Sequence, residues 1–261
     1  MVGGMTSLAA IIDQVKSKTA KNKSRFLPYA NGLDIECLAR QYREIRCKAP
    51  RRHQKKRKYL FERSGIPSSG ESSNQGEKHL AIALYHKFRT PDAMLLPSRQ
   101  RLEILDYEVP LFAVGSKDRV GSVDMLGLID GERLAVLELK VKGGDAPFGA
   151  TLEALVYAAI LEQNLEDIGL ELECAGYGVL QPKPLEIIVL ARADYWQEFN
   201  LYDKAWLKKL ARTLSKISRA LSLNIQFIEL EIGHLEMGLG GTRPELDGDV
   251  KIKSLFCSKV R

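Results

Sequence analysis

The chain has 261 residues, 45% of them apolar, which is enough to bury one sizeable core and to carry a smaller appendage. No segment approaches the ~20 consecutive apolar residues that span a bilayer, and the first ten residues lack a signal-type pattern, so we expect a cytoplasmic protein without membrane contact. The net charge of +6 is unevenly placed: residues 40–58 hold ten Lys or Arg and one acid, Glu44, and therefore carry +9 against −3 for the rest.

The four cysteines are widely separated, and none forms the closely spaced pairs that metal sites use. We therefore expect reduced thiols, with neither a zinc site nor an iron–sulfur (Fe-S) cluster. The four are Cys37, Cys47, Cys174 and Cys257.

Residues 1–70 are predicted to form a helical, basic N-terminal extension and linker, followed by one main domain over 71–261. Helices are expected at about 7–17 and 33–47, and the stretch between Ser64 and Gly76 has the turn-forming composition of a linker. The basic run that begins at Arg40 favours contact with a nucleic-acid backbone, because each neutralised phosphate releases counterions. The alternative is a solvated basic arm without a specific partner.

Apolar periodicity in the main domain predicts the order helix, three strands, helix and strand. Leu80, Leu84 and Phe88 recur every fourth position, which indicates a helix that begins at Glu77 and ends before Pro91. An Asp-Gly hairpin signal separates the second and third strands. The remaining expected elements are strands at about 103–114, 119–129, 133–141, 185–191 and 224–231, and helices at about 148–164 and 203–221.

Three charged residues on the second and third strands are the most informative. Asp124 lies on the second strand, and Glu138 and Lys140 interrupt the otherwise apolar third strand. Because side chains alternate across a strand, Glu138 and Lys140 share one face. Taken alone, the same residues also fit a surface acid and the solvated side of an edge strand.

The hairpin turn decides whether Asp124 joins the other two. A three-residue connection over 130–132 would set Asp124 opposite Glu138, whereas a two-residue turn would send the two acids to opposite faces of the sheet. A shared site therefore requires a connection of odd length or a bulge.

Two carboxylates at one cross-strand spacing repel each other unless a cation lies between them, and their hard oxygen atoms suit Mg2+ or Mn2+. Asp124 and Glu138 are the expected ligands, and the backbone carbonyl of Leu139 could add a third. Such an ion polarises a phosphoryl oxygen and helps to generate a hydroxide nucleophile. Lys140 would position the attacking water or stabilise the pentavalent phosphate.

This arrangement resembles the PD-(D/E)xK phosphodiesterase superfamily, whose members include restriction endonucleases, Holliday-junction resolvases and RecB-like exonucleases. In that family an αβββαβ core carries an Asp on the second strand and an acid, any residue and Lys on the third, and Asp124, Glu138 and Lys140 match these positions. The resemblance covers about 77–191. It implies an α/β fold of the restriction endonuclease-like type, with a mixed central sheet, and the activity of a magnesium-dependent nuclease.

The resemblance extends to three further residues. Glu77 lies on the helix row that faces the sheet, where family members often place an acid near the metal, although favourable charge at a helix N-terminus explains it equally. Glu153 and Tyr157 stand four apart on one helix face, where RecB-like members have Gln-x-x-x-Tyr. Glu153 would then orient Lys140 or a metal-bound water. Tyr157 would contact the nucleic acid, or it simply packs against the helix surface.

Several cations are expected to hold the phosphate backbone, which gives affinity rather than base readout. Lys142 is expected on the same face as Lys140. The others lie in the basic run and are Arg51, Arg52, Lys55, Lys56, Arg57 and Lys58.

Taken together, these patterns favour a metal-dependent nuclease that acts on DNA in preference to RNA, alone, as a homodimer or within a larger nucleoprotein complex. Two alternatives stay open. One is a catalytically silent nucleic-acid-binding module of the same fold. The other is a subunit that cleaves only inside a transposition, repair or defence assembly.

Overall fold

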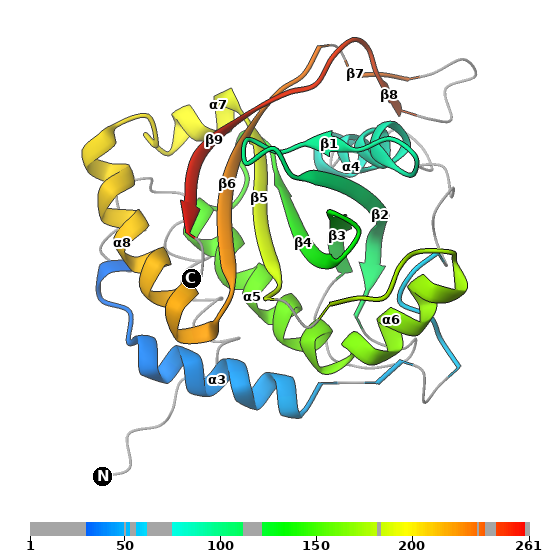
Figure 1. The fold of residues 1–261 in the computed structure, drawn as a ribbon. Helices are drawn as coiled ribbons and strands as arrows, with labels where there is room; N and C mark the ends of the chain where they lie inside the picture. Colours follow the sequence, from blue (N-terminus) through cyan, green and yellow to red (C-terminus); the bar gives the residue numbers. More distant parts are fainter. Residues whose placement is uncertain are drawn as a thin grey trace.

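The computed structural model describes residues 30–49, 51–52, 56–61, 75–111, 122–181, 184–233, 235–237 and 244–258. Their fold is mixed α/β, with a seven-stranded sheet that has helices on both faces (Figure 1). The helices are α3 (Ile35–Cys47), α4 (Gln75–Phe88), α5 (Pro147–Gln163), α6 (Leu165–Cys174), α7 (Ala193–Glu198) and α8 (Lys204–Leu221). The strands are β1 (Met94–Leu95), β2 (Arg101–Pro110), β3 (Ser122–Ile129), β4 (Arg133–Lys140), β5 (Glu186–Arg192), β6 (Asn224–Glu231), β7 (Leu235–Met237), β8 (Pro244–Leu246) and β9 (Lys251–Ser258).

The strand order of the large sheet is β1-β2-β3-β4-β5-β6-β9. Strands β1 to β4 pair antiparallel, β4, β5 and β6 run parallel, and β9 returns antiparallel against β6. Strands β7 and β8 form a separate two-stranded ribbon. The parallel strands bring the carboxyl ends of β4, β5 and β6 to one edge of the sheet, which is where ligands bind in open α/β sheets.

The elements expected as helix, three strands, helix and strand correspond to α4, β2, β3, β4, α5 and β5, with the short strand β1 before β2 and helix α6 before β5. The expected later helix and strand are α8 and β6, and the expected helix at 33–47 is α3. Strand β2 ends at Pro110, earlier than predicted. The helix expected at about 7–17 lies outside the described residues.

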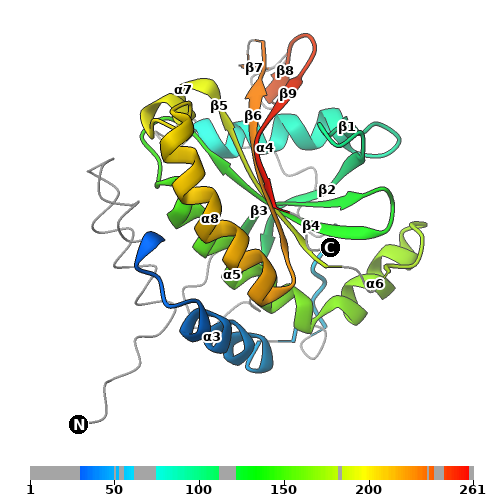
Figure 2. The same cartoon turned by 60° about the vertical axis from the view of Figure 1, so that its left-hand side comes forward.

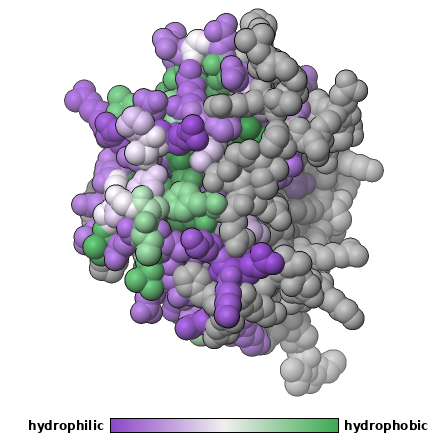
Figure 3. All heavy atoms as spheres, turned by 90° about the vertical axis from the view of Figure 1, so that its right-hand side faces the viewer, coloured by the Kyte–Doolittle hydropathy of each residue, from purple (hydrophilic) through white to green (hydrophobic). Residues whose placement is uncertain are grey.

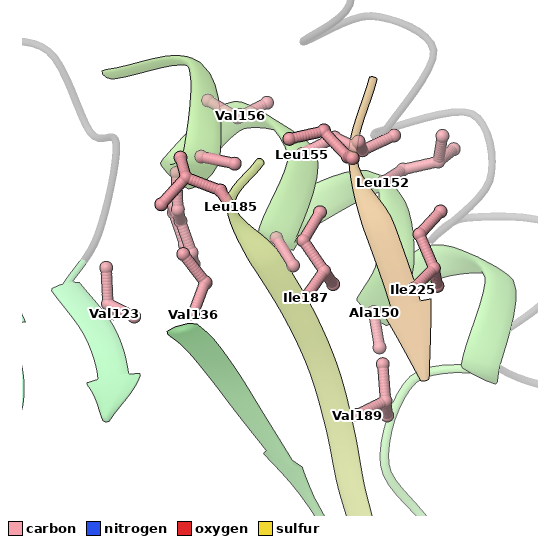
Figure 4. Close-up of a cluster of buried hydrophobic side chains, with 14 of the residues drawn as sticks. Val123, Val136, Ala150, Leu152, Leu155, Val156, Leu185, Ile187, Val189 and Ile225 are labelled. Carbon is pink, nitrogen blue, oxygen red and sulfur yellow. The ribbon is translucent and has the colours of Figure 1, made fainter. Parts of the chain in front are cut away.

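The core lies on both faces of the sheet. One face, here called the α5 face, is covered by α5 and α8, with α3 packed against these two helices, and the opposite α4 face is covered by α4 (Figures 1 and 2). Figure 4 shows Val136, Ile187 and Ile225 of three neighbouring strands on the side of the sheet covered by α5, which contributes Leu152 and Leu155 to the same cluster. Helix α5 is buried around most of its circumference, so any polar side chain on it has to find a partner inside the protein.

The described part of the predicted N-terminal extension packs into this same core. Leu38 and Tyr42 of α3, together with Tyr59 and Leu60, belong to the cluster on the α5 face. The buried carboxylate of Glu171 accepts hydrogen bonds from the backbone N–H groups of Tyr59 and Leu60 at 2.8 to 3.0 Å. The described part of the extension is therefore fixed to the main body, whereas the predicted boundary at residue 70 lies outside the described residues.

Several elements were not predicted, because they are short or have weak apolar patterns. Helix α6 directly follows α5 after Asn164, and α7 directly follows β5. Figure 3 shows the face that lies on the right of Figure 1, where the residues drawn in colour include an apolar patch bordered by polar ones. Exposed apolar side chains in and after α6 include Leu170 and Val179.

Among the described helices, none combines the length and the apolar character needed to cross a membrane.

Candidate active site

The hairpin between β3 and β4 has the odd-length connection that a shared site requires. Ile129 pairs with Arg133 across the turn, and Met125 pairs with Leu137. The left-handed backbone of Asp130, at φ 52°, and of Gly131, at φ 71°, closes the turn. The connection is thus the three-residue alternative, which meets the condition set by the sequence for a shared site, and in this register Asp124 and Glu138 project from the same face.

Asp124 lies just beyond the last paired residues of the hairpin and reaches across to β4. Its Oδ2 accepts a hydrogen bond from the backbone N–H of Leu139 at 2.8 Å. On β4, the Nζ of Lys140 donates to Glu138 Oε1 at 2.7 Å. The Glu138 and Lys140 side chains are 3% and 8% exposed, so this is a buried ion pair and not the solvated side of an edge strand.

One oxygen of each carboxylate lacks a hydrogen-bond partner among the described residues. Glu138 Oε2 is buried and accepts no hydrogen bond within the part of the chain that the structure describes. Asp124 Oδ1 likewise receives none from a described residue. Buried polar atoms are nearly always paired, so the open Oε2 of Glu138 needs a physical reason. Asp124 is only partly buried, so its open Oδ1 remains accessible beside it.

Burial governs the electrostatics of these three groups. It raises the pKa of Asp124 to about 6, against the opposing effects of Lys140 and of the Leu139 N–H. Burial also raises the pKa of Glu138 well above its usual range, and Lys140 opposes that shift. For Lys140 burial alone lowers the pKa, but the surrounding carboxylates, Glu138 first, outweigh it and leave the pKa raised.

Three further predicted residues lie around this centre. Glu77, in the first turn of α4, accepts a hydrogen bond from the backbone N–H of Val141 at 3.3 Å, directly after β4. On α5, the hydroxyl of Tyr157 donates to Glu153 Oε1 at 2.9 Å, as the four-residue spacing predicts. Glu77 and Glu153 both act on the pKa of Asp124 through their charge, so the structure brings the predicted acids into one electrostatic cluster.

Helix α7 contributes two residues that the sequence interpretation missed. The buried Tyr195 donates its hydroxyl hydrogen to the carbonyl oxygen of Asp145 at 2.6 Å, and Glu198 Oε2 accepts the Gly143 N–H at 2.7 Å. Both contacts hold the loop that follows Lys140. The sequence could have indicated these two residues, because they follow the buried strand β5. Residues that follow β5 lie at the same end of the sheet as the end of β4.

The cations predicted to contact phosphate differ in their exposure. Lys142 is exposed directly after β4, and Arg51, Lys56, Arg57 and Lys58 are exposed beside the segment that Glu171 binds. Lys55 lies outside the described residues.

Arg52 corrects the prediction. It is 2% exposed, its Nε donates to the carbonyl oxygen of Lys58 at 2.8 Å, and its guanidinium lies over the ring of Tyr59. The Arg52 side chain thus stabilises the segment that carries its exposed neighbours and is not presented to a phosphate.

The donor set suits a hard cation that keeps most of its own water. Within the described ranges, no group of three or more His, Cys, Asp or Glu side chains is placed to hold a metal ion. Magnesium usually binds through one or two carboxylates together with waters and substrate phosphates, so the open oxygens of Asp124 and Glu138 fit it.

In comparisons with protein-family models, with curated proteins and with solved structures, no significant match was found.

Proposed function

We propose that this protein is a metal-dependent nuclease of the restriction endonuclease-like type, which hydrolyses phosphodiester bonds in nucleic acid, DNA in preference to RNA. The observation that carries the proposal is the buried Glu138 Oε2, which lacks a hydrogen-bond partner among the described residues beside a second acid and a buried lysine. If the cluster served only to stabilise the fold, a donor of the protein would be expected to pair with that oxygen.

Asp124 and Glu138 are the residues that would hold the ion, with the Leu139 carbonyl as a further oxygen. Magnesium or manganese bound there supplies polarisation of the phosphoryl oxygen and activation of water. The chain's own contribution is to fix the two carboxylates before substrate arrives: the Leu139 N–H orients Asp124, and Lys140 orients Glu138.

Lys140 has a second role in this proposal. A buried ammonium beside the scissile phosphate stabilises the negative charge that develops during attack, because the surroundings screen it less than water would. Glu153 and Tyr157 bond to each other and line the same centre from α5, where they would orient Lys140 or the attacking water. Glu77 holds the backbone directly after Lys140 in place.

The test is cleavage of linear, circular and branched DNA with Mg2+ or with EDTA, by the wild type and by Asp124→Asn. We expect product only with Mg2+ and none from the variant, because Asn carries no charge to hold the ion. Cutting of the circular substrate separates an endonuclease from an exonuclease.

Glu166→Gln, which neutralises an exposed acid on α6, is the matched control and should cleave like the wild type. Three results contradict the proposal: no cleavage of any substrate by the wild type, cleavage that persists in EDTA, or cleavage by Asp124→Asn equal to that of the control.

A further inference from the structure

Helix α8 presents an unusual concentration of positive charge. It contains six cations and no acid, and all six are exposed. None of them forms an ion pair with a described acid. These residues are Lys204, Lys208, Lys209, Arg212, Lys216 and Arg219.

This charge pattern opposes the stability of the helix itself. Lys204, Lys208 and Arg212 are spaced four residues apart, and Lys216 continues the row, so successive like charges repel each other along one side. Lys204 also lies in the first turn, where the helix dipole disfavours a cation. A solvated helix usually mixes charges of both signs, so the row indicates a surface that meets a polyanion.

The opposite side of α8 packs against the core. Leu210, Leu214 and Ile217 are completely buried against the α5 face. A helix that lies on a membrane needs a free apolar side to insert among the lipids, and the described structure leaves none on α8. The exposed row offers charge alone, over about 18 Å of helix from Lys204 to Lys216, which favours a phosphate backbone over a lipid surface.

The location of α8 connects it to the candidate active site. It follows α7, whose Glu198 bonds to the loop after β4, so α8 begins near the sheet edge where the acids gather. Helix α3 packs beside α8 and adds the exposed Arg40 and Arg43 (Figures 1 and 2). A basic surface thus extends from that edge along one flank of the molecule.

We propose that the exposed face of α8, flanked by α3, binds the sugar-phosphate backbone of the nucleic-acid substrate without reading its bases. The inference rests on the proposed function for the identity of the polyanion. The contacts are ionic, so binding releases counterions and weakens steeply as salt concentration rises.

The test compares the wild type with the triple variant K208Q/R212Q/K216Q, using fluorescently labelled duplex and single-stranded DNA in EDTA at several salt concentrations. We expect binding at low salt to weaken by about tenfold or more, and the slope of log K against log salt to fall by about 0.9 for each lost duplex phosphate contact. The melting temperature should not fall, because the substitutions relieve repulsion within the helix.

K87Q/R89Q/R99Q is the charge control. It also removes three positive charges, two at the end of α4, which covers the opposite face of the sheet, and one in the loop after β1. Lys87 donates to the carbonyl oxygen of Gly248 and Arg89 lies over the ring of Tyr85, so the melting temperature of this variant is measured as well. Equal weakening by both variants would mean that only net charge matters and would overturn the proposal, as would unchanged binding by the α8 variant. The proposal would also be overturned, in favour of a membrane surface, if the α8 variant lost the wild type's binding to anionic phospholipid vesicles but still bound DNA.

Because EDTA prevents metal-dependent turnover, the binding result is separate from the cleavage test. Salt-dependent DNA binding through α8 without any cleavage would leave the surface in place and remove the nuclease proposal. Cleavage that requires Asp124, together with normal DNA binding by the α8 variant, would support the nuclease proposal and remove the α8 surface.

Discussion

Strand β4 carries buried charges at both of its ends, and the two clusters differ in how they are paired. At its start, Arg133 forms an ion pair with Glu186 at 3.2 Å, and Glu186 also accepts hydrogen bonds from Asn224 and Gln226. Both oxygens of this buried carboxylate are therefore paired, and the one buried atom of the cluster without a described partner is a donor, Arg133 Nε.

At the end of β4, the cluster of Glu138, Lys140 and Asp124 leaves acceptors open instead. Glu138 Oε2 is the buried atom without a described partner, and the neighbouring acids add negative charge around it. Open acceptors among several acids favour a cation from outside the chain, whereas a paired carboxylate needs nothing more. The carboxylate at the start of the strand is thus fully paired within the described residues, whereas the cluster at its end keeps an open acceptor, as the proposed metal site requires.

The largest expected effect is on catalysis, from Lys140→Ala. Removing a buried cation that stabilises transition-state charge should lower the cleavage rate by about 100-fold to 1,000-fold. DNA binding in EDTA should stay close to that of the wild type, because the proposed binding surface on α8 is unchanged. Single-turnover cleavage with Mg2+ measures the first effect and fluorescence anisotropy the second. A cleavage rate within a few-fold of the wild type would rule out the role assigned to Lys140.

Glu186→Leu should have the opposite profile and a smaller effect. It leaves Arg133, Asn224 and Gln226 without their shared acceptor, so the free energy of unfolding should fall by about 3 kcal/mol. Urea denaturation measures this loss. The cleavage rate per folded molecule should not change, because the cluster lies at the far end of β4. A variant with full stability but impaired cleavage would reverse the distinction between the two clusters.

A double substitution at the other end, Glu138→Leu with Lys140→Met, should leave stability unchanged or raise it by about 1 to 4 kcal/mol. Well-packed apolar residues often replace a buried ion pair without loss, because the cost of removing two charges from water disappears. The same protein should show no cleavage. A clear fall in the denaturation midpoint would show that this pair, like the one at Glu186, contributes mainly to stability.

The sequence predicted the main fold because its strongest elements have clear periods. The apolar row of α8 and the uninterrupted apolar run of β5 define their own boundaries, and strand alternation alone places Glu138 and Lys140 on one face. The sequence left open the length of the hairpin turn, which decides whether Asp124 shares that face. In the structure, two residues in left-handed conformations set this length.

Other features depend on contacts that no local pattern shows. Arg52 looks like its exposed basic neighbours in the sequence, and only the ring of Tyr59 and a backbone carbonyl make it a buried structural residue. Helix α7 is six residues long, too short for a helical period to be recognised, so Tyr195 and Glu198 were missed. Pairing between distant segments, such as β6 with β9, likewise has no signal in a single chain.

Glu198→Ala gives the smallest expected effect and tests whether the loop after β4 has to be held in place. The substitution removes the acceptor for the Gly143 N–H, and the loss of this hydrogen bond should destabilise the position of the loop by about 1 kcal/mol. Because Lys140 lies three residues before Gly143, we expect a several-fold lower cleavage rate with substrate affinity unchanged. Glu198→Gln keeps an oxygen acceptor without the charge and should restore most of the rate. Equal rates in the Ala variant and the wild type would show that Glu77 and Tyr195 suffice to hold the loop. Equal losses in the Ala and Gln variants would instead point to the charge of Glu198, which joins the acids around the end of β4.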